Sequence, residues 1–146
     1  MEKAEDLAMG SPEACLPGID LDTSIEPALR IILLPKDTNG TGTIFGGAIL
    51  SYIDLAGAVE ARRHCNAIFV TVSMREVVFR HPVYVGDVVS FYTKTKKIGT
   101  TSITVSVRVE AIRVIGEQAG ERVHVTEGEV VYVAMDQEGN KLRIGG

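Results

Sequence analysis

The chain has 146 residues, of which 45% are hydrophobic, so it is long enough for one domain with a buried core but short for two. Its formal net charge of −4 argues against a nucleic-acid-binding protein, because such proteins normally present a basic face. The sequence contains no apolar run of transmembrane length, which argues against insertion into a membrane.

The N-terminal residues 1–20 mix acidic residues with Gly, Ser and Pro, and they lack the basic start and apolar run of a secretory signal. We therefore expect a flexible tail over residues 1–20, a single domain over residues 21–146 and a cytoplasmic location. Cys15 and Cys65 do not belong to a paired motif, so they are interpreted as two free thiols in a reducing compartment. No cluster of His, Cys and Asp residues suggests a metal site.

Strand and turn signals follow one another along most of the chain, and they surround a single helical segment. An aliphatic strand over residues 28–34 ends at Pro35, a loop covers residues 35–42, and a helix begins near Gly46. Residues 101–114 alternate between apolar and polar side chains, which is typical of a half-exposed antiparallel strand. The other predicted strands cover residues 67–79, 88–98 and 123–135, with a turn at Gly86-Asp87. This order predicts an α+β fold in which one long helix packs on a mostly antiparallel sheet.

The predicted helix is apolar on two opposite sides. On a helical wheel, the stripe expected to face the sheet contains Phe45, Ala48, Ile49, Tyr52, Ile53, Ala56 and Val59. The opposite side carries one carboxylate, Asp54, among small or apolar residues, namely Gly47, Leu50, Ser51, Ala58 and Ala61. Because a helix that is apolar on all sides is buried on all sides, we expect a second copy of the chain to cover this opposite side.

Asp54 has no lysine or arginine three or four positions away along the helix. Burying an unpaired carboxylate is costly, so either a distant group binds it or it becomes protonated more easily than usual. Both conditions suit a base or a nucleophile, and a purely structural aspartate is the alternative. At the helix start, Gly46 and Gly47 predict free N–H groups that polarise a carbonyl oxygen, with close packing as the alternative reason for these glycines.

Three segments carry a resemblance to a known family: LPKDTNGTGTIFGGAILSYIDLAG over residues 34–57, TVSMREVVFRHPVYVGDVVSFY over residues 71–92, and GTTSITVSVRVE over residues 99–110. Together they resemble the hotdog-fold acyl-CoA thioesterases, most of all the YciA-like and cytosolic acyl-CoA hydrolase branch. The resemblance implies a curved antiparallel sheet wrapped around one long helix, and a homo-oligomer built from dimers, usually a trimer of dimers. It also implies a catalytic pair, Asp54 and Asn39, contributed by opposite subunits.

The reaction implied by the resemblance is hydrolysis of an acyl-CoA thioester to a free acid and CoA, with no cofactor and no metal. Asp54 would act as general base or nucleophile, Asn39 would orient the water or the thioester, and the N–H groups of Gly46 and Gly47 would polarise the carbonyl. The substrate-binding candidates are Thr71, Val72 and Ser73 beside the pantetheine arm, Arg80 and His81 before Pro82, and Lys96, Lys97, Thr100, Thr101 and Ser102 around the Gly99 turn for the CoA phosphates. The structural alternatives are plain strand core for the first group and a solvated basic hairpin for the last.

Other functions fit the sequence less well. The absence of a G-x-S-x-G motif argues against a serine hydrolase elbow. A hotdog dehydratase would use a histidine together with a carboxylate, but none of His64, His81 and His124 lies in the central part of the helix. A non-catalytic acyl-CoA sensor of this fold would carry a DNA-binding helical segment ahead of the domain, which the short acidic N-terminal segment does not resemble. A purely structural oligomer is the remaining alternative.

Overall fold

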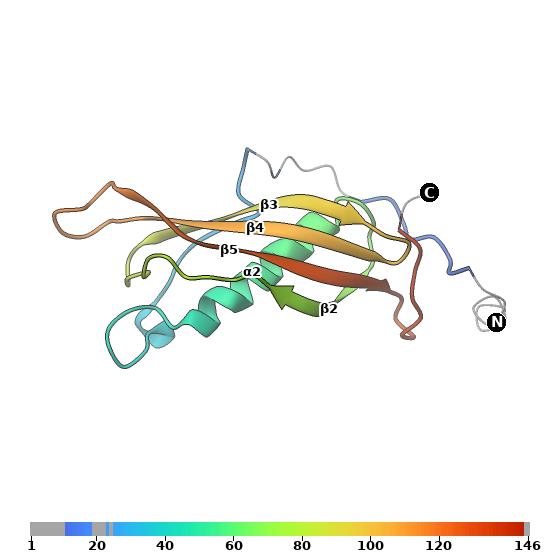
Figure 1. The fold of residues 1–146 in the computed structure, drawn as a ribbon, viewed down its shortest axis with the longest axis horizontal. Coiled ribbons are helices and arrows are strands. Elements are labelled where there is room, and N and C mark those ends of the chain that lie inside the picture. The colour runs from blue at the N-terminus through green and yellow to red at the C-terminus, as the bar shows by residue number, and fades with distance from the viewer. Residues whose placement is uncertain (1–10, 19–22, 24, 145–146) are drawn as a thin grey trace.

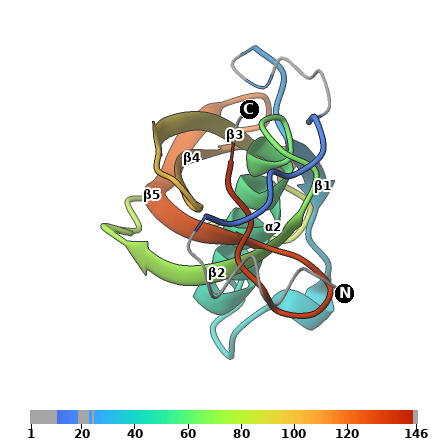
Figure 2. The same ribbon diagram turned by 90° about the vertical axis from the view of Figure 1, so that its right-hand side faces the viewer.

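The computed structural model describes residues 11–18, 23 and 25–144. Within them, a five-stranded antiparallel sheet curls around one long helix, as Figure 1 shows from the side and Figure 2 from one end. The strands lie in the order β1-β3-β4-β5-β2. The elements are β1 (Leu29–Ile32), the 3-10 helix η1 (Pro35–Asp37), α2 (Gly46–Ala61), β2 (Ile68–Arg75), β3 (Val88–Ile98), β4 (Ser102–Ile112) and β5 (Arg122–Met135). The predicted α+β arrangement of a curved sheet around one helix is confirmed.

The core lies between the concave face of the sheet and α2. The alternation predicted for β4 is confirmed, because Ile103, Val105, Val107 and Val109 are fully buried while Arg108 between them is exposed. Burying an aliphatic side chain of this size contributes about 1.5–3 kcal/mol relative to leaving it exposed. The alternation therefore decides which face of β4 meets the helix.

β2 is shorter than the strand that the sequence predicts over residues 67–79. It ends at Arg75, and the next residue, Glu76, has a φ of 62°, a left-handed conformation outside the β region. The chain then runs beside β5 without a regular ladder, and the N–H of Arg80 donates to the carbonyl of Val125 at 2.8 Å. This change in backbone direction brings Arg80 close to the start of α2.

β2 forms one edge of the sheet, and β5 is its one hydrogen-bonded neighbour among the described residues. Val72 forms a β-bulge in this strand, because Thr71 and Ser73 on either side of it pair with consecutive residues of β5. The Val72 side chain is 55% exposed, and Ile68 and Val70 on the same strand are exposed as well. An open strand edge with apolar side chains is a template for pairing with another chain.

The stripe of α2 that faces the sheet differs from the predicted stripe at both ends. Ile49, Ile53 and Ala56 are buried as expected. Phe45 is 58% exposed, because it precedes the helix with extended backbone angles, so the helical wheel does not apply to it. Glu60, which the wheel left out, is buried in the last turn. Within the described ranges, the helices are too short or too polar to cross a membrane.

Glu60 is fully buried, and threonine hydroxyls surround its carboxylate. Thr95 and Thr93 donate from β3 at 2.5 and 3.1 Å, Thr23 donates from the N-terminal side, and Arg63 donates from the helix end at 3.0 Å. Burial alone would raise the pKa of Glu60, but these hydrogen bonds and the charge of Arg63 outweigh burial and lower the pKa below its ordinary value. The core therefore holds an ionised carboxylate.

Replacing Glu60 with glutamine should lower the free energy of unfolding by about 1–3 kcal/mol at neutral pH, because Arg63 and the hydroxyls lose a charged acceptor. Since the folded-state pKa lies below the ordinary value of 4.5, the stability that Glu60 contributes is complete above that value and is lost as the pH falls through the folded-state pKa. Thermal unfolding followed from neutral to acidic pH checks this. The glutamine variant should lose less stability on acidification than the wild type, and an equal loss would assign the acid sensitivity to other carboxylates.

The predicted turn at Gly86-Asp87 is confirmed, and a buried ion pair ties it to the residue that follows β4. Gly86 has a φ of 94°, which suits glycine. The Asp87 carboxylate accepts a hydrogen bond from the N–H of Tyr84 at 2.9 Å and pairs with the buried Arg113, which also donates to the carbonyl of Pro82 at 3.0 Å. These contacts fix the segment that leads into β3.

A strap formed by residues 13–18 lies across the C-terminal end of α2. Cys15 in this strap is disulfide-bonded to Cys65, with their Cα atoms 5.5 Å apart. The N–H of Asn66 donates to the carbonyl of Leu16 at 2.8 Å beside the disulfide. The interpretation of two free thiols is therefore wrong, because the fold brings together two cysteines whose wide spacing in the sequence gives no sign of contact.

The tail predicted over residues 1–20 is described only in part, since residues 1–10 and 19–20 lie outside the described residues. The strap is packed closely on the domain, because a side chain at Gly18 would overlap the carbonyl of Arg63. The boundary between tail and domain, like the cytoplasmic location, stays a prediction.

Candidate active site

Asp54 lies in the middle of α2, on the side of the helix next to β2. The hydroxyl of Thr71 in β2 donates a hydrogen bond to Oδ1 of Asp54 at 2.6 Å. The main-chain carbonyl of Asp54 accepts a second hydrogen bond from the hydroxyl of Tyr132 in β5 at 2.5 Å. Asp54 is half-buried. Thr71 is thus a group distant in the sequence that binds the Asp54 carboxylate, which was one of the two expected possibilities.

Thr71, Val72 and Ser73, which the sequence assigns to substrate binding, lie on an exposed stretch of β2. Thr71 contacts Asp54, Val72 bulges out of the strand, and Ser73 pairs with Val131 of β5. Because all three residues are exposed in the single chain, their alternative interpretation as plain strand core is wrong for this chain on its own.

Gly46 and Gly47 form the first turn of α2, as the sequence predicts. At Gly47 a side chain would overlap the ring of Phe45, so packing within the chain explains this glycine. At Gly46 a Cβ atom would lie 3.6 Å from the ring of Phe79, an ordinary contact that does not demand glycine. The first N–H groups of a helix have no acceptor within the helix and lie at the positive end of its dipole. Gly46 is therefore the better candidate for binding a substrate carbonyl.

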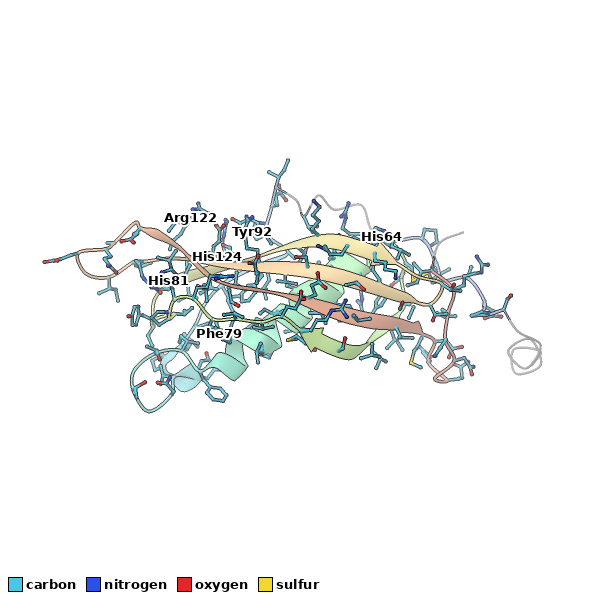
Figure 3. The ribbon with its side chains drawn as sticks, in the orientation of Figure 1. His64, Phe79, His81, Tyr92, Arg122 and His124 are labelled. Atoms are coloured by element: carbon cyan, nitrogen blue, oxygen red, sulfur yellow. A yellow bond between two sulfur atoms is a disulfide. The ribbon has the colours of Figure 1, made fainter. Side chains whose placement is uncertain are left out.

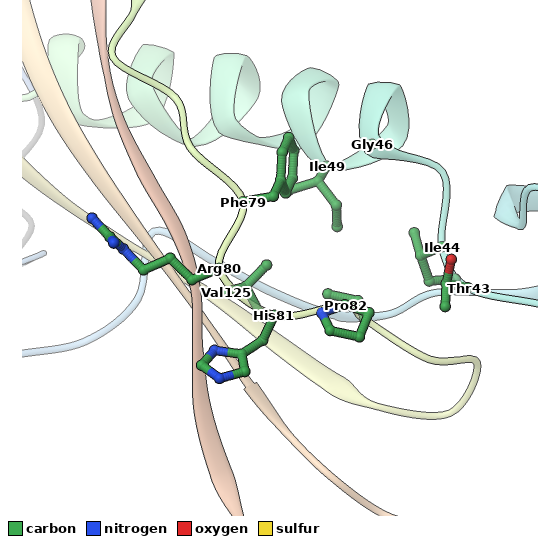
Figure 4. A pocket seen from close by; sticks show the side chains of 10 residues that line it. Thr43, Ile44, Gly46, Ile49, Phe79, Arg80, His81, Pro82 and Val125 are labelled. Carbon is green, nitrogen blue, oxygen red and sulfur yellow. The ribbon is translucent and has the colours of Figure 1, made fainter.

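A pocket of about 310 Å³ opens beside Gly46, and Figure 4 shows it from close by. Its walls come from Thr43 in the loop before α2, from the first turns of α2, and from the segment after β2 that contains Phe79, Arg80 and His81. The structure thus brings together Gly46, Arg80 and His81, which the sequence assigned to catalysis and substrate binding. The other lining side chains are mainly apolar, which suits a ligand with an apolar part and a polar part.

Arg80 and His81 are the ionisable residues among those that line this pocket, and in Figure 4 the Arg80 side chain extends away from the start of α2. The Nδ1 atom of His81 donates to the carbonyl of His124 at 2.8 Å, which orients the ring. Arg80 lies 3.5 Å from Glu127 in an exposed ion pair. Such a pair contributes at most about 1 kcal/mol, so breaking it to free the guanidinium costs little.

Asn39 lies in the loop before α2, where its side chain holds the backbone of its own loop. Its Oδ1 atom accepts hydrogen bonds from the N–H groups of Thr41 and Thr43 at 2.8 and 3.3 Å, and its Nδ2 atom donates to the Thr43 hydroxyl at 2.8 Å. This pattern is typical of an asparagine that shapes a tight turn. Within the described residues, no hydrogen bond joins Asn39 to Asp54 of the same chain.

The candidate residues form two groups within one chain. Asn39, Gly46 and the pocket lie at the start of α2, whereas Asp54 and Thr71 lie further along the helix. Asp54 lies eight positions after Gly46 in α2, which corresponds to about 12 Å at the helical rise of 1.5 Å per residue. A carbonyl held at the helix start is therefore out of reach of Asp54 in the same chain.

The residues expected to bind CoA phosphates lie at the other end of the molecule. They end β3 and form the turn to β4, and they are Lys96, Lys97, Thr100, Thr101 and Ser102. Lys96 is ion-paired with Glu129 at 3.6 Å. In Figure 3, His64 marks this end, and Phe79 and His81 mark the end that holds the pocket. A single chain does not bring these two sets of residues together.

Three residues of this region were missed by the sequence interpretation: Phe79, Tyr132 and Gly57. Phe79 and Tyr132 follow the strand pattern of their segments, so nothing distinguishes them from core residues. Gly57 carries a detectable signal, because glycine inside a helix costs about 1 kcal/mol relative to alanine and thus indicates a close approach. The approaching group is the ring of Tyr132, two atoms of which lie 3.0 Å from where a Cβ at Gly57 would be.

Residues 41–113 match the model of the Thioesterase superfamily. The chain belongs to this superfamily. The acyl-CoA thioester hydrolase YciA of Salmonella typhimurium is 41% identical to it over 114 residues, which cover 78% of this chain and 86% of the relative.

Solved structures of other thioesterases have the same fold. A hexameric hotdog fold thioesterase of Campylobacter jejuni has a TM-score of 0.80 and 46% sequence identity, covering 86% of this chain and 93% of that chain. A hexameric broad-specificity acyl-coenzyme A thioesterase, solved as a variant with an aspartate replaced by alanine, has a TM-score of 0.77 and 38% identity, covering 81% of this chain and 85% of that chain. The predicted hotdog fold of this thioesterase is therefore confirmed.

Proposed function

We propose that this thioesterase hydrolyses acyl-CoA thioesters and that two copies of the chain complete each active site. The activity is supported by membership of the superfamily and by similarity to acyl-CoA thioester hydrolases. The two-copy site is inferred from the separation of about 12 Å along α2 between the helix start and Asp54.

A second copy has a suitable surface to cover next to Asp54. β2 presents its open edge there, Val72 is exposed, and Leu55 on the adjoining helix face is 58% exposed. Covering this surface removes apolar side chains from water and pairs the open strand edge. A two-fold contact then makes two equal sites, each with Asn39 and Gly46 of one chain and Asp54 of the other. The hexameric neighbours support a further assembly of three such dimers.

Asp54 is assigned to the chemical step. As a general base, it takes a proton from a water molecule whose oxygen attacks the thioester carbonyl, the carbon–sulfur bond breaks, and the CoA sulfur receives the proton. As a nucleophile, its carboxylate attacks the carbonyl, releases CoA and forms an acyl-Asp54 anhydride that water then hydrolyses. In both routes the N–H of Gly46 stabilises the carbonyl oxygen as it gains charge, and Asn39 orients the water or the thioester.

The remaining candidates are assigned to substrate binding. Arg80 and His81 contact polar parts of the ligand at the pocket, and Thr71 to Ser73 flank the pantetheine arm. The turn from Lys96 to Ser102 binds the phosphates of a CoA molecule held at the pocket of another copy of the chain. In its own chain this turn lies at the far end of the sheet from the pocket.

Release of free thiol from a panel of acyl-CoA esters tests the activity. We expect saturable turnover without added cofactor, and the panel also shows which acyl chain lengths the pocket accepts. Tight binding of the same esters without thiol release would instead indicate an acyl-CoA sensor, and neither binding nor release would indicate a structural oligomer.

Mixing two inactive variants tests the shared site. Asn39→Ala and Asp54→Ala should each lose turnover, because each removes one side of every site. After subunits are exchanged, about a quarter of the wild-type activity should return, since half of the dimers are mixed and each mixed dimer holds one intact site. Thiol release measured before and after exchange checks this, with mass spectrometry to show that mixed dimers have formed. Confirmed mixing without recovery would refute the two-copy site and leave the activity itself standing.

A further inference from the structure

Tyr132 reaches the helix at the residue that carries the reactive carboxylate. It lies in β5, its side chain is 1% exposed, and its hydroxyl lies 2.5 Å from the main-chain oxygen of Asp54. A Cβ atom at Gly57 would overlap this hydroxyl, so glycine at position 57 is what lets the ring approach the helix. The contact therefore depends on a matched pair of residues, Tyr132 and Gly57.

Thr71 and Tyr132 face each other across two paired strands. They are direct partners in the antiparallel ladder of β2 and β5, so their side chains project from the same face of the sheet. Thr71 donates to the Asp54 carboxylate, and Tyr132 donates to the Asp54 main chain. The bulge at Val72 follows Thr71 directly and shifts the register, and pairing resumes at Ser73, which lies opposite Val131. Two hydroxyls from neighbouring strands thus hold one helical residue, one at its side chain and one at its backbone.

The Tyr132 hydroxyl is a permanent donor. Burial, followed by the charge of Asp54 and a hydrogen bond to Asp54, raises the pKa of Tyr132 far above its ordinary value. A carbonyl inside a helix already accepts one hydrogen bond from the N–H four residues later, and its second lone pair accepts another. The hydroxyl uses this second lone pair, so it pins the helix at Asp54 without breaking the helical ladder.

We propose that Tyr132, packed against Gly57, is a positioning residue for the hydrolysis. It fixes the position of the Asp54 main chain relative to the substrate carbonyl, while Thr71 fixes the orientation of the Asp54 carboxylate. This inference rests on the proposed function. When the carboxylate and the substrate carbonyl are held by different chains, the carboxylate must be held firmly in place, because a displacement of about 1 Å in a reacting group costs up to 10²-fold in rate. Substrate binding at the helix start of the other chain does not involve Tyr132.

Replacing Tyr132 with phenylalanine keeps the ring and removes the hydroxyl. We expect kcat to fall about tenfold while KM stays within a factor of about two, because positioning for the chemical step is lost and substrate binding is not. Tyr52→Phe is the matched control, since Tyr52 is a partly buried tyrosine on α2 whose ring packs on Phe91, and it should keep the wild-type kcat. The carbonyl carbon resonance of Asp54 should move in the Tyr132 variant and stay in place in the control.

Gly57→Ala tests the same contact from the helix side. The new methyl group displaces the Tyr132 ring, so kcat per folded protein should fall in the wild-type background. The same substitution should have a smaller effect when Tyr132 is already phenylalanine, because the two changes remove one shared contact. If Tyr132→Phe changes neither the turnover nor the Asp54 carbonyl resonance, this inference is overturned and the proposed function still stands. Absence of turnover in the wild-type chain would refute the proposed function and this inference with it.

Discussion

Replacing Asp54 with asparagine should lower kcat by about 10²–10⁴-fold, because an amide neither takes a proton from water nor attacks a thioester. Asparagine keeps the size of the side chain and an oxygen that accepts the hydrogen bond from Thr71. The melting temperature of the variant should therefore stay close to that of the wild type. Thiol release from the best acyl-CoA of the panel, measured at saturating substrate, checks the prediction.

Glu117→Gln is the matched control for this loss of a carboxylate. Glu117 is exposed in the connection between β4 and β5, outside the pocket, so its replacement should leave kcat unchanged. Wild-type turnover by the Asp54 variant would remove Asp54 from the chemical step. A matching loss in the control variant would show that the assay responds to net charge and not to this residue.

Removing the disulfide through Cys15→Ala and Cys65→Ala together should lower the free energy of unfolding by about 4 kcal/mol in the chain-entropy model. The two cysteines are 50 residues apart, so the cross-link restricts a long loop in the unfolded chain. Urea unfolding of the wild type and the double variant under oxidising conditions checks this. Turnover well below the melting temperature should persist, because the strap lies at the opposite end of α2 from Gly46.

A reducing agent provides the control for the disulfide. It should bring the stability of the wild type down to the level of the double variant, and it should leave the double variant unchanged. Two reactive thiols per chain in wild-type protein that was denatured without a reducing agent would contradict the cross-link. Equal stability of the two proteins under oxidising conditions would show that the strap adds nothing to the fold.

The strands and the helix were largely predictable because each has a pattern that repeats within a few residues. β3 covers residues 88–98 as predicted, and β4 buries the expected side of its alternation. The end of β2 was not predictable, because apolar residues continue beyond Arg75 while the backbone at Glu76 leaves the β region. Hydrophobic pattern alone does not show where a strand stops pairing when the following segment packs on the same neighbour.

The candidate site was predictable in its residues more than in its arrangement. A lone carboxylate on an otherwise apolar helix face singled out Asp54, and the glycine pair marked the helix start. The distance between them along α2 appears only when both are placed on one helix. The hairpin from Lys96 to Ser102 has suitable chemistry for phosphates, but its position at the far end of the sheet follows from strand lengths and pairing, which side-chain chemistry does not reveal.

The sequence by itself determined that this protein has one long helix, several strands of which one alternates clearly, and a single acid on a second apolar face of that helix. These features are local, since they depend on periods of about two and 3.6 residues that any segment displays on its own. The tertiary structure alone decided which hydroxyls hold Asp54, that threonines and an arginine enclose Glu60, and that Cys15 meets Cys65. Those contacts join residues far apart in the chain, and they exist only because the curled sheet closes around the helix and brings their strands and termini to it.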